Sequence, residues 1–392
     1  MPVTNERVWW RRVGPWVGIG TSPVAMMTGG GIAETNHGWR LVAAAALGIC
    51  ALAALAAAQG VLGTRRHARF AAVAADSLGP VGSRVVAAPV LAAMMIGWFG
   101  FNTALAGAAL GQLVHVPTRV GVVIFAAVML GVAWYGLDVL SHAALLAGCA
   151  TVVLAAGGLH LALADHTGPL LAQDRPTGSL AIITAVGIIV GYGAAFSLRT
   201  PDFTHDLAGP RDVGLCALFG LALPLLAFVI VGAVLQTTTG TWNLVQVLER
   251  VGSPAIGYGF MALGFTGSVL SNLHSGAVAF EELMPRRSHR DGLMVTGALG
   301  TALALIDYSD RMIPFLTAMA LAAPCLIAVL WMDERRRRRA STPVRMSALL
   351  GWGAGGAVGA ALAFAARPWA LPAGLVVAAV VGALSDRAAG PK

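Results

Sequence analysis

The chain has 392 residues, of which 57% are hydrophobic and only 11% are charged. Because a soluble domain carries about 25% charged residues, this composition excludes a soluble enzyme, a nucleic-acid-binding module and a disordered chain. The net charge of +8 is no sign of nucleic-acid binding, since the basic residues cluster between long apolar runs. Contiguous apolar runs favour an all-α integral membrane protein over a β-barrel, whose strands only alternate.

Twelve apolar segments follow one another along the chain, most of them long enough to cross a bilayer. In chain order they lie at 13–34, 39–62, 81–113, 118–137, 140–164, 178–200, 212–236, 253–283, 292–306, 311–332, 346–366 and 368–386. No soluble domain remains between them, so we expect a single transmembrane domain over residues 1–392. With the N-terminus in the cytoplasm, the inner loops hold 20 of the 26 basic residues and the outer loops hold 6. The positive-inside rule then predicts a multi-pass protein of the cell membrane with both termini cytoplasmic.

Two segments carry signals of an interrupted helix. Glycine permits unusual backbone angles and proline removes a donor, so the glycines and the proline of the first segment predict an interruption near Gly20–Pro23. Glycines in the sixth segment predict a second one near Gly191–Gly193. The two are equivalent if five-helix repeats occupy 13–164 and 178–332, followed by two additional helices at 346–386. Such paired interruptions are typical of transporters with inverted repeats and a site at mid-membrane.

Several short motifs occur in the order and spacing of a known family. They are Met26-Met27-Thr28-Gly29-Gly30, Gly97-Trp98-Phe99-Gly100, Asp202-Phe203 and Pro314-Phe315-Leu316-Thr317-Ala318. With them, nearly the whole chain resembles the nucleobase–cation symporter family, in its cytosine permease branch. The resemblance implies a five-plus-five inverted-repeat transporter fold with two additional helices. It also implies a secondary active transporter that imports a small planar, nucleobase-like heterocycle by alternating access, driven by a cation gradient.

The resemblance implies a substrate site around Trp98, whose flat indole would stack on the substrate ring. The other expected substrate-binding residues are Met95, Ser22, Gly191, Tyr192, Gly193 and Thr266. The amides with which the family reads cytosine are absent at the matching positions. A site without those hydrogen-bonding groups should reject this polar base, so the sequence predicts a different heterocycle.

The cation site that the resemblance implies lies between the first interruption and the eighth segment. It matches the carbonyls of Gly18 and Thr21, together with the chain near Thr266. The family's pair of hydroxyls on the eighth segment matches Val269 and Leu270. Since neither side chain can coordinate a hard cation, we expect no sodium coupling.

Proton coupling is the alternative to sodium. Ionisable residues within the membrane are functional candidates by default, and His274 lies two turns from Thr266 on the eighth segment. We therefore expect His274 to be the first candidate for proton coupling.

Other classes of membrane protein fit the sequence less well. The chain has no HExxH motif, no GxSxG motif in a suitable context and no paired intramembrane carboxylates, so we expect no enzyme, catalytic residue, metal or cofactor. The spans lack the polar stripe that lines a channel. The closest alternative is a transporter of the same superfold for an amino acid or a vitamin precursor, which would bind a carboxylate at the first helix instead of stacking a ring on Trp98. The expected partners are the small-molecule substrate, a coupling proton and the lipid bilayer, with no nucleic acid.

Overall fold

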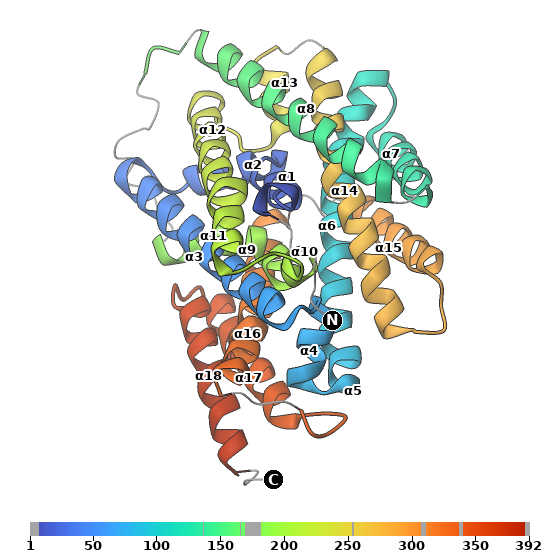
Figure 1. The fold of residues 1–392 in the computed structure, drawn as a ribbon. Helices are drawn as coiled ribbons and strands as arrows, with labels where there is room; N and C mark the ends of the chain where they lie inside the picture. Colours follow the sequence, from blue (N-terminus) through green and yellow to red (C-terminus); the bar gives the residue numbers. More distant parts are fainter. Residues whose placement is uncertain are drawn as a thin grey trace.

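The computed structural model describes residues 8–135, 137–164, 166–168, 182–252, 255–306, 311–336 and 340–388. Within these residues every element of regular structure is a helix (Figure 1). The first residues of the predicted segments 178–200 and 253–283 lie outside the described residues. The helices follow the apolar segments of the sequence, and seven helical runs are long and apolar enough to cross a membrane.

The helices of the first half follow a short 3-10 turn, η1 (Trp9–Arg11). They are α1 (Gly14–Gly20), α2 (Pro23–Ala33), α3 (Gly38–Arg66), α4 (Phe70–Leu78), α5 (Pro80–Gly82), the π-helical turn η2 (Ser83–Ala87), α6 (Ala88–Val114), α7 (Thr118–Trp134) and α8 (Leu137–Ala164). Helix α6 continues α5 and η2 without a gap, so the three form one run over Pro80–Val114.

The second half is built in the same way. Its helices are α9 (Ile182–Arg199), α10 (Pro201–Thr204), α11 (Pro210–Leu215), the π-helical turn η3 (Cys216–Ala222), α12 (Leu223–Thr239), α13 (Leu244–Arg250), α14 (Ala255–Leu283), α15 (His289–Ala304) and α16 (Met312–Arg335). The chain ends with α17 (Met346–Phe364) and α18 (Ala370–Ala388).

The first apolar segment is divided where serine meets proline. Helix α1 ends at Gly20, and Pro23 opens α2. A residue that precedes proline is pushed out of the helical region, and Ser22 is extended, with φ −67° and ψ 145°. Its hydroxyl accepts the N–H of Val24 at 3.3 Å and so caps the new helix.

The predicted interruption at Gly191–Gly193 is wrong, because α9 runs without a break through these residues. Both glycines are packing positions. A Cβ at Gly191 would lie 1.8 Å from the carbonyl oxygen of Leu316 in α16, and a Cβ at Gly193 would lie 2.6 Å from the Leu52 side chain in α3. Glycine permits a break but does not force one, and here it lets α16 and α3 approach the α9 backbone.

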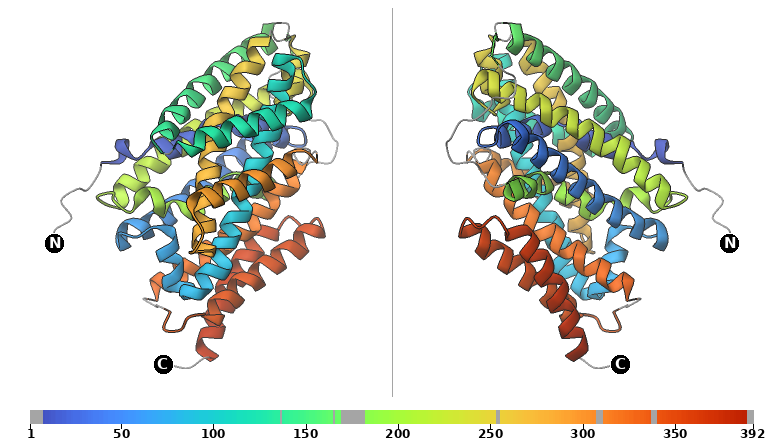
Figure 2. Two further views of the ribbon diagram at one scale, coloured as in Figure 1. Left: turned by 90° about the vertical axis from the view of Figure 1, so that its right-hand side faces the viewer. Right: turned by 90° about the vertical axis from the view of Figure 1, so that its left-hand side faces the viewer.

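Corresponding helices of the two halves make corresponding contacts. Helix α2 packs along α12 and α9 packs along α3, while α6 packs on α7 and α14 packs on α15. Helices α6 and α14 also pack against each other. The large buried side chains of this central assembly include Trp16, Phe99, Phe101 and Phe265. Helices α17 and α18 pack on each other and on α16, at the periphery of the molecule (Figure 2).

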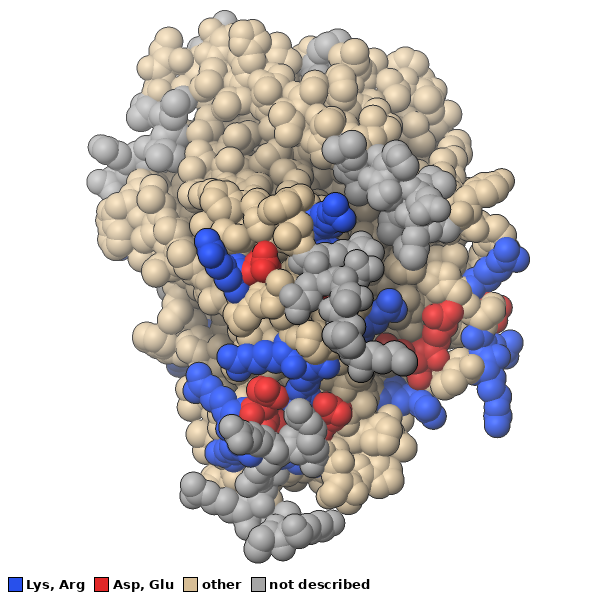
Figure 3. Space-filling view, viewed as in Figure 1, with Lys and Arg blue, Asp and Glu red and all other residues tan. Residues whose placement is uncertain are grey.

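Charged side chains tie several helices together at one end of the molecule. Arg66, at the end of α3, pairs with Asp76 of α4 at 3.0 Å and with Glu334 of α16 at 2.5 Å. Arg345, just before α17, pairs with Asp333 at 2.7 Å. On the face drawn in Figure 3, the charged side chains gather in the middle and lower parts, and the upper third shows none among the described residues.

Candidate functional site

Trp98 is the centre of an aromatic cluster between three helices. Its ring meets Phe101 of α6, Tyr192 of α9 and Phe315 of α16 edge-on, with centroid distances of 5.9, 6.0 and 5.0 Å. Phe101 and Phe315 in turn stack on each other at 6.3 Å. Trp98 is 7% exposed. The structure therefore encloses a large flat indole where α6 meets α9 and α16.

Tyr192 joins this aromatic cluster to the division between α1 and α2. Its hydroxyl donates a hydrogen bond to the carbonyl oxygen of Ile19, in the last turn of α1, and interacts with the side chain of Ser22. The end of a helix leaves carbonyl groups without an intrahelical partner, and Tyr192 supplies a donor to one of these last-turn carbonyls. Three residues that the sequence predicts for the site, Ser22, Trp98 and Tyr192, thus lie together.

Met95 lies one turn before Trp98 on α6 and contacts a buried arginine. Its sulfur is 3.9 Å from Nη1 of Arg199, the last residue of α9. Nη2 of Arg199 donates to the hydroxyl oxygen of Ser271 in α14 at 2.7 Å, and the guanidinium lies 5.0 Å from the ring centroid of Phe203. Arg199 is 5% exposed. This side chain therefore connects α9 to both α6 and α14.

Sequence reasoning missed Arg199, because the orientation argument counts it among the loop arginines. The structure instead buries it at the end of a spanning helix. A usable signal was present in the sequence. Arg199 follows Tyr192 by seven residues, about two helical turns, so both side chains lie on one face of α9.

Asn102 is a second residue that the sequence analysis missed. It follows Trp98 by four residues and so shares its face of α6. It is 2% exposed, and its Oδ1 has no hydrogen-bond partner among the described residues. A buried acceptor without a partner is costly, so this amide is a candidate for contact with a ligand. The sequence signal that could have found Asn102 is an amide side chain within an otherwise apolar segment.

Thr266 does not share the face of α14 that meets the divided helix. That face is marked by Gly264, where a Cβ would lie 3.1 Å from Pro23 of α2 and 2.7 Å from the hydroxyl oxygen of Thr151 in α8. Thr266 comes two residues later, about 200° around the helix. Its own hydroxyl donates to the carbonyl oxygen of Leu263 at 2.7 Å. The structure therefore turns the Thr266 side chain away from α2 and α8.

The other residues of the expected cation site lie near α8 or within the core. Thr21, between α1 and α2, donates its hydroxyl to the carbonyl oxygen of Val17 at 2.8 Å. The Thr21 hydroxyl is also 3.9 Å from where a Cβ at Gly148 of α8 would stand. A Cβ at Gly18 would meet nothing within 4 Å. Val269 and Leu270 are buried. The described residues contain no group of three or more His, Cys, Asp or Glu side chains that could hold a metal ion.

His274 lies in the last third of α14 (Ala255–Leu283), beside a second histidine. Its ring centroid is 5.0 Å from that of His289 in α15, and Nδ1 of His289 is 3.3 Å from Oε1 of Glu281. No direct contact with Trp98 is present in the described part of the chain. His274 therefore lies nearer the charged end of the molecule than the aromatic cluster does.

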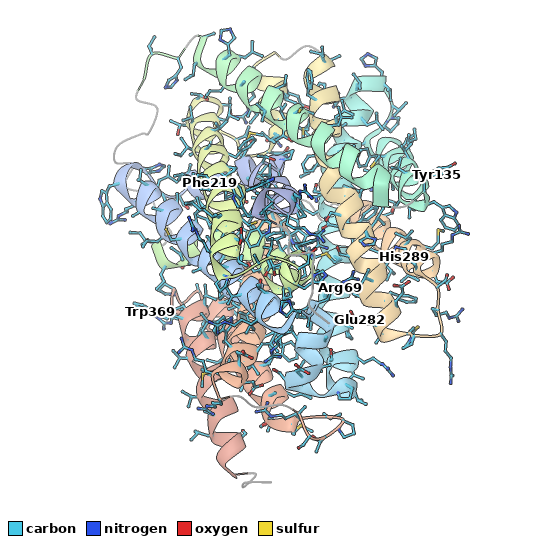
Figure 4. All side chains as sticks on the ribbon, in the orientation of Figure 1. Arg69, Tyr135, Phe219, Glu282, His289 and Trp369 are labelled. Carbon is cyan, nitrogen blue, oxygen red and sulfur yellow. The ribbon has the colours of Figure 1, made fainter. Side chains whose placement is uncertain are left out.

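Acidic and basic side chains surround this end of α9 and α14. Asp202 of α10 accepts the N–H of Phe70 at 2.8 Å. Burial raises the pKa of Asp202, an effect that the Phe70 hydrogen bond and the charge of Arg199 oppose. Arg69, Glu282 and His289 are labelled near one another in Figure 4.

A family model described as permease for cytosine/purines, uracil, thiamine and allantoin matches residues 3–347. The chain belongs to this permease family. The matched residues contain Trp98 and every other residue of the aromatic cluster, whereas α18 and all but the start of α17 lie beyond them. A search of curated protein sequences finds no match to this permease.

Three solved structures share the fold of the permease. Mhp1, a transporter of the nucleobase-cation-symport-1 family, was solved closed with bromovinylhydantoin bound. It matches with a TM-score of 0.81 and 19% identity, over 98% of this chain and 93% of Mhp1. The inward-facing conformation of Mhp1 matches with a TM-score of 0.85 and 18% identity, over 99% and 94%. A substrate-bound, outward-open structure of a Na⁺-coupled sialic acid symporter matches with a TM-score of 0.73 and 13% identity, over 99% and 91%. The permease is a multi-pass membrane protein of this transporter fold.

Proposed function

We propose that this permease imports a small planar, nucleobase-like heterocycle by alternating access, with the ring stacked on Trp98. The placement of Trp98 supports this most strongly. Its indole is enclosed by α6, α9 and α16. Tyr192, which contacts the indole, also bonds to the last turn of α1, next to the division between α1 and α2. An indole offers a broad face for a flat ring, and such stacking contributes about 0.5–1.5 kcal/mol beyond the buried area.

The other residues divide into ligand-contacting and packing positions in this proposal. Tyr192, which meets the indole, contacts the substrate together with Ser22, Met95 and Asn102. Gly191 and Gly193 act indirectly, because they let α16 and α3 approach the helix that carries Tyr192.

The proposal includes twelve membrane spans and two inverted repeats, over 13–164 and 178–332, with α17 and α18 as additions. The matching contacts of α2 with α12 and of α3 with α9 support the repeats. The charged end of the molecule, where α3 and α16 end in arginine, fits the cytoplasmic side of a cell membrane. Both termini then lie in the cytoplasm.

A thermal-shift screen of the purified permease tests the proposed substrate. Pyrimidines, purines, hydantoins, vitamins and amino acids would be added one at a time in detergent. A ligand at 100 times its Kd stabilises the folded state by about 2.7 kcal/mol, so a heterocycle that binds should raise the unfolding temperature clearly. Stabilisation by an amino acid, with no effect of any planar heterocycle, would instead favour the alternative substrate of the same superfold.

Proton coupling, rather than sodium coupling, completes the proposal. A sodium ion needs several oxygen ligands, by analogy with other hard cations. Thr266 faces away from α2, and Val269 and Leu270 offer only hydrocarbon. If the alignment of α14 with the family were shifted by one residue, Ser271 would take a position in the cation site. Its hydroxyl oxygen, however, already accepts a hydrogen bond from the guanidinium of Arg199. A second cation beside that group would be repelled.

We expect uptake into proteoliposomes to be unchanged when choline replaces sodium at fixed pH. We further expect uptake to depend on a pH gradient and His274→Gln to weaken that dependence, because the substitution removes the titrating ring. His160→Gln is the matched control, since His160 is exposed on α8. A steep dependence on sodium would contradict this prediction and show that other oxygens complete a sodium site.

A further inference from the structure

Arg199 is a buried cation that forms no ion pair with a carboxylate of the described residues. Its contacts are the hydroxyl of Ser271, the thioether of Met95 and the ring of Phe203. No carboxylate among the described residues lies within ion-pair distance of it. Asp202 attracts it electrostatically but uses its own Oδ1 to accept the N–H of Phe70. Burying a charge is costly unless it is paired, so a guanidinium held in this way has strong capacity to bind an anion.

Two helices, α9 and α6, show that Arg199 lies close to Trp98. On α9 it lies two turns beyond Tyr192, on the same face, and the Tyr192 ring meets the Trp98 indole. On α6 its contact is Met95, one turn before Trp98. The guanidinium therefore lies about one turn from the indole, toward the charged end of the molecule.

Asn102 occupies the opposite end of the same face of α6. Seven residues separate Met95 from Asn102, about 10 Å along the helix axis, and Trp98 lies between them. The site thus has a cation at one end and a flat aromatic face in the middle. At the other end it has an amide oxygen that no donor of the described residues reaches.

The two ends select different chemical groups. A guanidinium only donates hydrogen bonds, and its planar fork matches the two oxygens of a carboxylate. The Oδ1 of Asn102 only accepts. A ring stacked on Trp98 is therefore best held with a negatively charged oxygen toward Arg199 and a ring N–H toward Asn102.

We propose that the substrates of this permease are anionic planar heterocycles, whose charged oxygen pairs with Arg199 while the ring lies on Trp98. This inference rests on the proposed function and narrows its substrate class. A neutral ring of the same shape binds more weakly, because the positive charge of Arg199 then stays buried without an anion.

Two ligands that share one ring test the proposal. Uracil is neutral, and orotate is the same ring with a carboxylate. Calorimetric titration of the purified permease should show that orotate binds at least about tenfold more tightly than uracil, on the scale of one charge-assisted hydrogen bond. Arg199→Gln should abolish this preference while uracil affinity stays within about threefold, and Arg199→Lys should keep part of it, because it retains the charge without the fork.

Arg69→Gln is the matched control, because Arg69 is an exposed arginine at the same end of the molecule. It should leave the ratio of the two affinities unchanged. If the Arg199→Gln variant binds both ligands like the wild-type protein but no longer transports them, Arg199 serves only to hold helices together, and the proposal is overturned.

The remaining outcomes separate the two proposals. Equal binding of uracil and orotate to the wild-type protein would overturn the anionic class while leaving a heterocycle permease in place. Failure of every planar heterocycle to bind, charged or neutral, would overturn the proposed function and this inference together.

Discussion

Replacing Trp98 with alanine is expected to abolish binding of the planar substrate. The change removes the stacking face and leaves a void against Phe315 and Phe101, whose rings now pack on the indole. Trp98→Phe keeps an aromatic face of smaller area and should weaken binding by about 1 kcal/mol, or roughly fivefold in Kd. Titration of the best ligand from the thermal-shift screen measures both effects.

One control variant and one folded reference make this prediction decisive. Trp39→Ala removes a tryptophan that is 70% exposed at the start of α3 and should leave affinity unchanged. Trp98→Phe serves as the folded reference if Trp98→Ala proves unstable. Wild-type affinity in Trp98→Ala would show that the ligand binds elsewhere or is not aromatic.

Gly191→Ala is expected to destabilise the permease severely, whereas Gly187→Ala is expected to be tolerated. The added Cβ at Gly191 would overlap the carbonyl oxygen of Leu316, at 1.8 Å, and a main-chain atom cannot move aside without displacing α16. Overpacking of this kind typically costs 1–3 kcal/mol and sometimes more. At Gly187, one turn earlier on α9, a Cβ would meet nothing within 4 Å. There the better helix propensity of alanine could contribute up to about 1 kcal/mol of stability.

Thermal unfolding in detergent, together with the yield of monodisperse protein, compares the two glycine variants. Because they differ by one turn of the same helix, the comparison isolates the contact with α16 from the general effect of alanine in a membrane helix. Equal stability of the two variants would contradict the packing role assigned to Gly191.

Much of the fold could be predicted from the sequence, because the residues that cause it act on their own neighbours in the chain. Long apolar runs must form helices in a bilayer, since the backbone has no water with which to bond. The division between α1 and α2 follows from Ser22 and Pro23 themselves: the proline excludes its neighbour from the helix, and the serine hydroxyl caps the next one. Trp98, in contrast, was selected by the resemblance of a short motif around it to a known family, and its contact with the substrate stays a prediction.

Other features of the site depend on which helix lies opposite, and they could not be derived from a segment alone. Gly191 and Gly193 suggested a break because glycine is permissive, yet their role is set by Leu316 and Leu52, which are distant in sequence. Gly264 fixes the side of α14 that meets α2, and Thr266 lies about 200° around the helix from it; the assignment of Thr266 to the substrate site stays a prediction.

The sequence by itself determined that this protein is a helical membrane protein with a divided first helix, and its resemblance to the nucleobase–cation symporter family implied a permease with an indole in the third apolar segment. Only the tertiary structure decided that Arg199, one of many arginines near helix ends, lies buried between α6, α9 and α14. The physical reason is that composition and proline act on the residues beside them in the chain. Burial and pairing of a charge arise only when separate helices pack together.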